Sequence, residues 1–143
     1  MKKRILCLLS LLLFCVGCQS TQSITLNQTV TLSFFYIESC SQCQAFKKQA
    51  IPKLEETFQE RLIIHQYDLD DEKTQPIYDQ VIDSLVDFDE EYYGNGPFIV
   101  VEGYFALLGY NAGDEDALIQ DIQQATQGKE LGYELEGFRF LYK

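Results

Sequence analysis

Two cysteines are the residues of this chain best placed to do chemistry. Cys40 and Cys43 are separated by two residues, a spacing at which two sulfur atoms can meet within one helical turn. In thiol–disulfide exchange the attacking species is a thiolate, which the dipole and the unpaired N–H groups of a helix N-terminus favour. Because a helix is expected to begin at residue 41, the pattern predicts that Cys40 attacks and that Cys43, one turn further in, resolves the mixed disulfide.

The segments around the pair predict an α/β domain. Residues 31–37 form a continuous apolar, β-branched and aromatic run, which is typical of a strand buried on both faces. Further strands are expected at 61–67, 98–101 and 104–110, and helices at 41–60, at 74–88 and from Asp114 to Gly128. The order is strand, helix, strand, helix, strand, strand, helix, which predicts a mixed sheet with helices on both faces.

Apolar residues at every fourth position predict the buried face of each helix. In the first helix they are Phe46, Ala50, Leu54 and Phe58, and Pro52 is expected to kink that helix because it has no N–H to donate. In the second they are Ile77, Val81, Leu85 and Phe88. Residues 24–26 and the aromatic tail 129–143 are candidates for additional strands, the tail with no assigned place.

The amino-terminal segment is typical of an export signal. Lys2, Lys3 and Arg4 precede an apolar run at 5–16, which is shorter than the about 20 residues of a membrane-spanning helix. The sequence Cys15-Val16-Gly17-Cys18 then resembles the lipobox of bacterial lipoproteins. That resemblance implies a signal peptide at 1–17, lipid on Cys18 as the mature amino terminus, and an extracytoplasmic protein anchored to the cell membrane.

The amino-terminal interpretation divides the chain. Residues 18–29 are expected to form a polar tether, and 30–143 a single domain. Cys15 stands where the lipobox more often has leucine, so ordinary secretory cleavage is an alternative, and an uncleaved anchor is another. If Cys7 and Cys15 leave with the signal and Cys18 carries lipid, Cys40 and Cys43 can pair only with each other.

The charge of the chain disfavours nucleic acid as a partner. The formal net charge is −11, and removal of Lys2, Lys3 and Arg4 with the signal would leave −14. A surface of this sign repels phosphate backbones.

The cysteine motif and its setting resemble the thioredoxin superfamily. Ser39-Cys40-Ser41-Gln42-Cys43 follows a buried strand, Pro52 lies in the next helix, and Gly96-Pro97 leads into a β-hairpin about fifty residues later. The resemblance covers 30–128, and Cys43-x-x-Phe46 with Pro52-Lys53-Leu54 is similar to exported DsbA-like proteins. It implies a thioredoxin-like fold, no cofactor, and an oxidoreductase that acts on cysteines of exported proteins and exchanges electrons with a membrane redox partner.

The resemblance also implies roles for residues near the pair. Pro97 would be cis and pack against the cysteines, and Gly96 would present its backbone to an extended substrate segment. Phe34 stands where thioredoxins have a buried aspartate. Glu38 is the nearest carboxylate and could relay a proton, or could simply be solvated at the end of the strand. Ser41-Gln42 matches the dipeptide of neither thioredoxins nor strong oxidases, so the direction of electron flow stays open.

Other interpretations of the same residues remain. The pair could form an inert disulfide in a non-catalytic lipoprotein that binds a partner, or serve a specialised reductase for haem-protein maturation or repair. A zinc site needs four ligands, and His65 is the only histidine that could join the two cysteines. His65 is instead expected to be a packed or surface residue. A solvated loop is favoured over a calcium site for Asp68, Asp70, Asp71 and Glu72, which lack the EF-hand spacing. No metal is therefore expected.

Overall fold

The computed structural model of the protein describes residues 24–143. The predicted signal peptide at 1–17, the predicted lipid site at Cys18 and the first half of the predicted tether lie outside the described residues. Between residues 24 and 143, no helix combines the length and the apolar character needed to cross a membrane.

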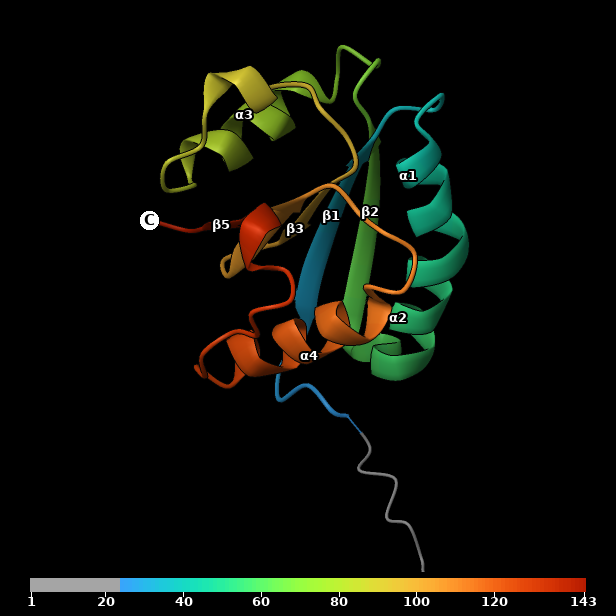
Figure 1. Cartoon of the computed structure of the whole chain (residues 1–143), viewed down its shortest axis with the longest axis vertical. Helices are drawn as coiled ribbons and strands as arrows, with labels where there is room; N and C mark the ends of the chain where they lie inside the picture. Colours follow the sequence, from blue (N-terminus) through green and yellow to red (C-terminus); the bar gives the residue numbers. More distant parts are fainter. Residues whose placement is uncertain (1–23) are drawn as a thin grey trace, which may run out of the picture.

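A mixed five-stranded sheet forms the centre of the described region (Figure 1). Its strands are β1 (Val30–Tyr36), β2 (Leu62–Asp68), β3 (Phe98–Val101), β4 (Phe105–Leu108) and β5 (Arg139–Leu141). Their order is β2-β1-β3-β4-β5, with β1 parallel to β2 and each of the other neighbouring pairs antiparallel. The predicted α/β class with a mixed sheet is confirmed.

The helices follow the strands in the predicted order. They are α1 (Ser41–Ala45), the π-helical turn η1 (Phe46–Ala50), α2 (Ile51–Phe58), α3 (Gln75–Asp83) and α4 (Glu115–Thr126), with 3₁₀ turns η2 (Gln59–Arg61), η3 (Glu90–Tyr92) and η4 (Glu136–Phe138). The segments α1, η1 and α2 run on without a break. Together they form the helix expected at 41–60.

The irregularity predicted at Pro52 takes the form of the π-helical turn η1. The N–H of Ile51 donates to the carbonyl of Phe46, five residues back, just before the proline that has no N–H to donate. This wider turn keeps residues four positions apart on the same side of the helix. Phe46, Ala50 and Leu54 are accordingly all fully buried. The helix thus meets the sheet along one continuous apolar face.

Two apolar clusters lie on opposite faces of the sheet. Leu32 and Phe34 of β1 pack with residues of α1, η1, α2 and α4, whereas Phe35 packs with Tyr78 of α3 and with Leu85. Successive residues of β1 therefore point into different clusters, as the two-residue period of a strand requires. The predicted cover of helices on both faces is confirmed.

The second predicted helix is shorter than expected. It was predicted to reach Phe88 but ends at Asp83, and Ile77, predicted to face inward, is 38% exposed while Tyr78 is buried. The cause is pairing with the far end of the chain. Leu85 bridges to Tyr142, and the N–H of Val86 donates to the carbonyl of Leu141 at 2.8 Å. The candidate strand at 24–26 is also wrong, because Leu26 packs into the core without strand pairing.

A buried ion pair anchors the carboxyl-terminal tail, whose strand β5 pairs with β4 at the edge of the sheet. The guanidinium of Arg139 donates to the carboxylate of Asp121 on α4 and, at 2.9 Å, to the carbonyl of Gly132. Asp121 also accepts the N–H of Gly132 at 2.8 Å. The two charged side chains are only 8% and 2% exposed, so each depends on the other.

Arg139→Met is expected to lower the free energy of unfolding by about 3 kcal/mol, because it leaves the Asp121 carboxylate buried without its cation. Urea unfolding followed by circular dichroism measures this loss. Adding Asp121→Leu should restore part of the stability, since it removes the orphaned charge.

The matched control is Lys53→Met, which breaks the exposed ion pair between Lys53 and Asp116. It should cost less than about 1 kcal/mol. An Arg139→Met variant as stable as this control would contradict the anchoring role of the buried pair.

Candidate active site

Cys40 caps the amino terminus of α1, as the sequence predicted. Its backbone is extended (φ −79°, ψ 119°), and its Sγ accepts the N–H of Cys43 at 3.1 Å. A tight turn delivers it there, since the N–H of Cys40 donates to the carbonyl of Ile37 at 3.0 Å, directly after β1. The half-buried sulfur thus lies where unpaired helical N–H groups favour negative charge.

Cys43 lies one turn into the helix and is 1% exposed. Burial raises the pKa of its thiol to about 12, with a further increase from the hydrogen bond to Cys40, while the charge of Lys47 lowers it. The core around it is aromatic. Phe34 of β1 packs on Phe46 with ring centroids 4.6 Å apart. At neutral pH Cys43 is therefore a protonated thiol.

Gly96 covers the cysteine pair with backbone alone. Its carbonyl lies 3.5 Å from Sγ of Cys40, and a Cβ added to it would lie 3.4 Å from Sγ of Cys43. Pairing of Phe35 with Phe98 across β1 and β3 brings this loop to the cysteines. The Gly96–Pro97 peptide bond is cis. The structure therefore brings together Cys40, Cys43, Gly96 and Pro97, the residues that the sequence analysis selected.

Glu38 lies beside the site, and its ion pair and hydrogen bonds are with Lys47 and Gln44. Its carboxylate pairs with Lys47 at 3.1 Å and accepts from the side chain of Gln44 at 3.4 Å, and its backbone carbonyl accepts from Gln44 at 2.8 Å. Among the hydrogen bonds found within residues 24–143, none joins Glu38 to a cysteine. Its predicted role in a proton relay stays a prediction.

Lys47 is a neighbour of the pair that the sequence analysis missed. Its ammonium lies 3.2 Å from the ring centroid of Tyr36 and is held by Glu38. The signal was available, because Lys47 follows Cys43 by four residues and so shares its side of the helix. It is the cation that lowers the pKa of the Cys43 thiol.

The other missed residues meet at Gly109, just after β4. The N–H of Gly109 donates to the carbonyl of Pro97 at 2.8 Å. A Cβ on Gly109 would lie 3.7 Å from the ring of Phe138 and 4.0 Å from Oε1 of Gln42. Its φ of +93° also suits glycine. No local pattern in the sequence predicted that the tail residue Phe138 would come so close to the site.

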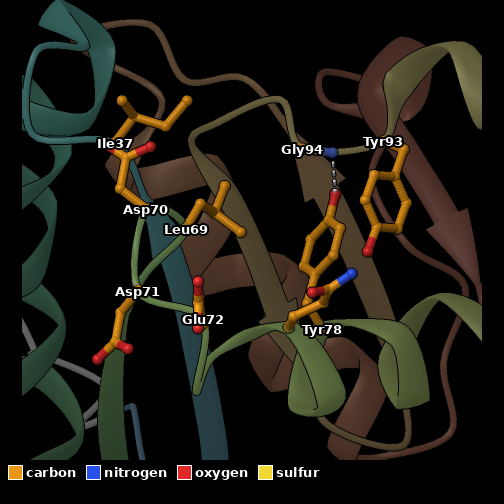
Figure 2. Close-up of a pocket in the computed structure, with 9 residues that line it drawn as sticks. Ile37, Leu69, Asp70, Asp71, Glu72, Tyr78, Tyr93 and Gly94 are labelled. Atoms are coloured by element: carbon orange, nitrogen blue, oxygen red, sulfur yellow. Dashed lines mark hydrogen bonds between the residues drawn. The ribbon is translucent and has the colours of Figure 1, made fainter.

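A cavity of about 220 Å³ lies among loops that adjoin the cysteine turn, and Figure 2 shows the residues that line it. Its lining includes Ile37, which begins the cysteine turn, and Gly94, which lies two residues before Gly96. The cavity therefore adjoins the two loops that hold the cysteine pair. The hydroxyl of Tyr78 accepts the N–H of Gly94 at 3.2 Å and points toward that loop in Figure 2. Tyr93 and the acidic side chains of residues 70–72 complete much of the lining.

Two of the acidic residues considered for calcium, Asp68 and Asp71, serve as turn caps. The carboxylate of Asp68 accepts the N–H of Asp70, and that of Asp71 accepts the N–H of Lys73, each at 3.0 Å. In the part of the chain that the structure describes, no three His, Cys, Asp or Glu side chains are gathered so as to hold a metal ion. His65 is an exposed residue of the outer strand β2.

In comparisons with protein-family models, with curated proteins and with solved structures, nothing matches this chain. What the site can do therefore follows from its geometry. An accessible sulfur at a helix start and a buried thiol one turn later can form and break a disulfide between them.

In the reduced protein, Cys40 should react with iodoacetamide at pH 7 at least about tenfold faster than Cys43, because Cys43 is buried and protonated. Mass spectrometry of the digested protein after timed labelling measures both rates. In a Cys40→Ser variant, labelling of Cys43 should keep rising as the pH is raised toward 11, since burial still raises the pKa of its thiol and the thiolate fraction grows with pH below that pKa. Equal rates for the two cysteines at pH 7 would contradict the asymmetry.

Proposed function

We propose that this chain is a thiol–disulfide oxidoreductase of the thioredoxin-like kind, in which Cys40 is the nucleophile and Cys43 the resolving thiol. The observation that carries the proposal is the asymmetry of the pair. Cys40 is partly accessible and accepts a helical N–H at 3.1 Å, whereas Cys43 is enclosed in an aromatic core. A pair that served only as a structural link would need no such difference.

The fold supports the same assignment. A central strand, β1, ends at the cysteine pair, and Gly96-Pro97 opens the neighbouring strand β3. The loop before β3 therefore lies over the sulfurs, where the lack of a side chain at Gly96 lets its backbone approach Sγ of Cys43 closely. An extended client segment bound here would be recognised through its backbone.

The proposed reaction is an exchange of disulfide bonds. The Cys40 thiolate attacks one sulfur of a client disulfide, a bond forms between Cys40 and the client, and the other client sulfur leaves as a thiolate that takes up a proton. Cys43 then loses its proton and attacks Sγ of Cys40, which releases the second client sulfur. The client gains two electrons and two protons, and the Cys40–Cys43 disulfide forms. Run in reverse, the same steps oxidise a client dithiol.

The burial of Cys43 fits the second step. A protonated, enclosed thiol competes poorly for external disulfides, and it sits one turn from the sulfur that it must attack. Lys47 favours its ionisation when that step comes, because a nearby cation stabilises the thiolate. We assign Lys47 to positioning this charge and Glu38 to holding Lys47 in place, as their ion pair supports.

We also propose that the domain works outside the cytoplasm, held to the membrane by lipid on Cys18. The apolar run at 5–16 and the sequence Cys15-Val16-Gly17-Cys18 support this localisation. Exported proteins with thiols or disulfides would then be its clients. A membrane redox partner would return the Cys40–Cys43 pair to its starting state.

Cys43→Ser should trap clients as mixed disulfides on Cys40, because the resolving thiol is gone. Non-reducing electrophoresis of membranes from cells that express the variant should show adducts that dithiothreitol removes. Adding Cys18→Ala to the trap should move those adducts out of the membrane fraction.

The control is Cys40→Ser, which lacks the nucleophile and should carry no adducts. If Cys43→Ser carries no more adducts than this control, the pair is not catalytic. The chain would then be better described as a binding lipoprotein with a structural disulfide.

A further inference from the structure

Phe138 is an aromatic residue that the tail brings to the rim of the cysteine site and leaves uncovered. Its side chain is 47% exposed, and it belongs to neither apolar cluster of the described residues. The residues around it in the tail behave differently. Leu135 is buried in one cluster, and Phe140 packs on Phe88 in the other, with ring centroids 5.1 Å apart. The tail is thus fixed on both sides of Phe138 while Phe138 itself faces outward.

Two routes, which meet at Gly109, place Phe138 on the same rim as Cys40. The first runs through the loop before β3: the carbonyl of Gly96 lies 3.5 Å from Sγ of Cys40, and the next residue, Pro97, accepts the N–H of Gly109 at 2.8 Å. A Cβ on Gly109 would touch the Phe138 ring at 3.7 Å. The second runs through Gln42, whose side chain would lie 4.0 Å from that same Cβ.

Gly109 therefore has no side chain of its own at this rim. Gln42, from the dipeptide between the cysteines, and Phe138 both come within about 4 Å of the point where its Cβ would lie. A client segment whose cysteine reaches Cys40 across Gly96 would place a flanking residue near these two side chains. An apolar side chain there would cover the exposed part of the Phe138 ring, which favours binding.

We propose that Phe138 is a specificity-determining residue that contacts an apolar side chain next to the reacting cysteine of the client. The inference rests on the proposed function of Cys40. It gives the carboxyl-terminal tail a part in the site, because η4 and β5 hold the aromatic ring of Phe138 at the rim of the cysteine pair. The preferred client is an extended, apolar segment. The protein that binds it carries a formal net charge of −11, so Phe138 would be an apolar contact on an otherwise acidic surface.

The test uses the purified full chain, in reduced form, and three disulfide probes. Two are short peptides whose single cysteine is joined to glutathione, one flanked by leucines and one by serines, and the third is oxidised glutathione. In each case the Cys40 thiolate attacks, the probe's S–S bond breaks, and a glutathione or peptide thiol leaves. The rates are measured by quenching with acid and counting, by mass spectrometry, the adducts on Cys40 together with the Cys40–Cys43 disulfide that forms when Cys43 resolves them.

The unmodified protein should prefer the leucine peptide to the serine peptide about tenfold, and Phe138→Ala should reduce that preference to about twofold, since the ring supplies much of the apolar contact. The rate at which Phe138→Ala reacts with oxidised glutathione should stay within twofold of the rate of the unmodified protein. Phe138→Leu should keep most of the preference. Tyr133→Ala is the matched control, because Tyr133 is an aromatic residue of the same tail that is 83% exposed, and it should leave all three rates unchanged.

Two results would overturn the inference alone: a Phe138→Ala variant that keeps the preference, or one that loses rate equally with all three probes, which is what a structural role predicts. If the unmodified protein does not react even with oxidised glutathione, the proposed function fails, and the inference fails with it.

Discussion

The burial of β1 on both faces is the constraint on which the site depends. Phe34 packs toward α1, η1, α2 and α4, and Phe35 packs toward α3. A slip of the strand by one residue would exchange its two faces and force each ring into a cluster packed around the other. The chain must therefore leave the sheet at Tyr36, and the tight turn from Ile37 to Cys40 starts the helix at one fixed place. The position of Sγ of Cys40 is a consequence of core packing.

The same packing separates the two cysteines chemically. Cys40 stays at the surface of the helix start, while Cys43 is carried into the layer between helix and sheet, where burial raises the pKa of its thiol to about 12. Gly96 completes the enclosure with backbone alone. The two cysteines of a single helical turn thus differ in exposure: Cys40 is half-buried and Cys43 is fully enclosed.

Much of this could be predicted from sequence because the signals were local. The apolar run around Phe34, the spacing of Cys40 and Cys43, and Gly96-Pro97 before a strand each depend on neighbours in the chain. What could not be predicted was long-range pairing. Val86, which was predicted to be helical, pairs instead with Leu141, and no pattern near either residue encodes the other. For the same reason the tail had no assigned place, and Phe138 was missed as a neighbour of the site.

The proposed oxidoreductase must cycle between dithiol and disulfide, and its reduction potential shows whether it can. The purified protein, equilibrated in glutathione buffers, should show a Cys40–Cys43 couple between about −120 and −270 mV, the range of known exchange catalysts. The value would also indicate whether clients are oxidised or reduced. A potential below about −300 mV, together with an unreactive Cys40, would contradict the account, because that is the behaviour of a structural disulfide.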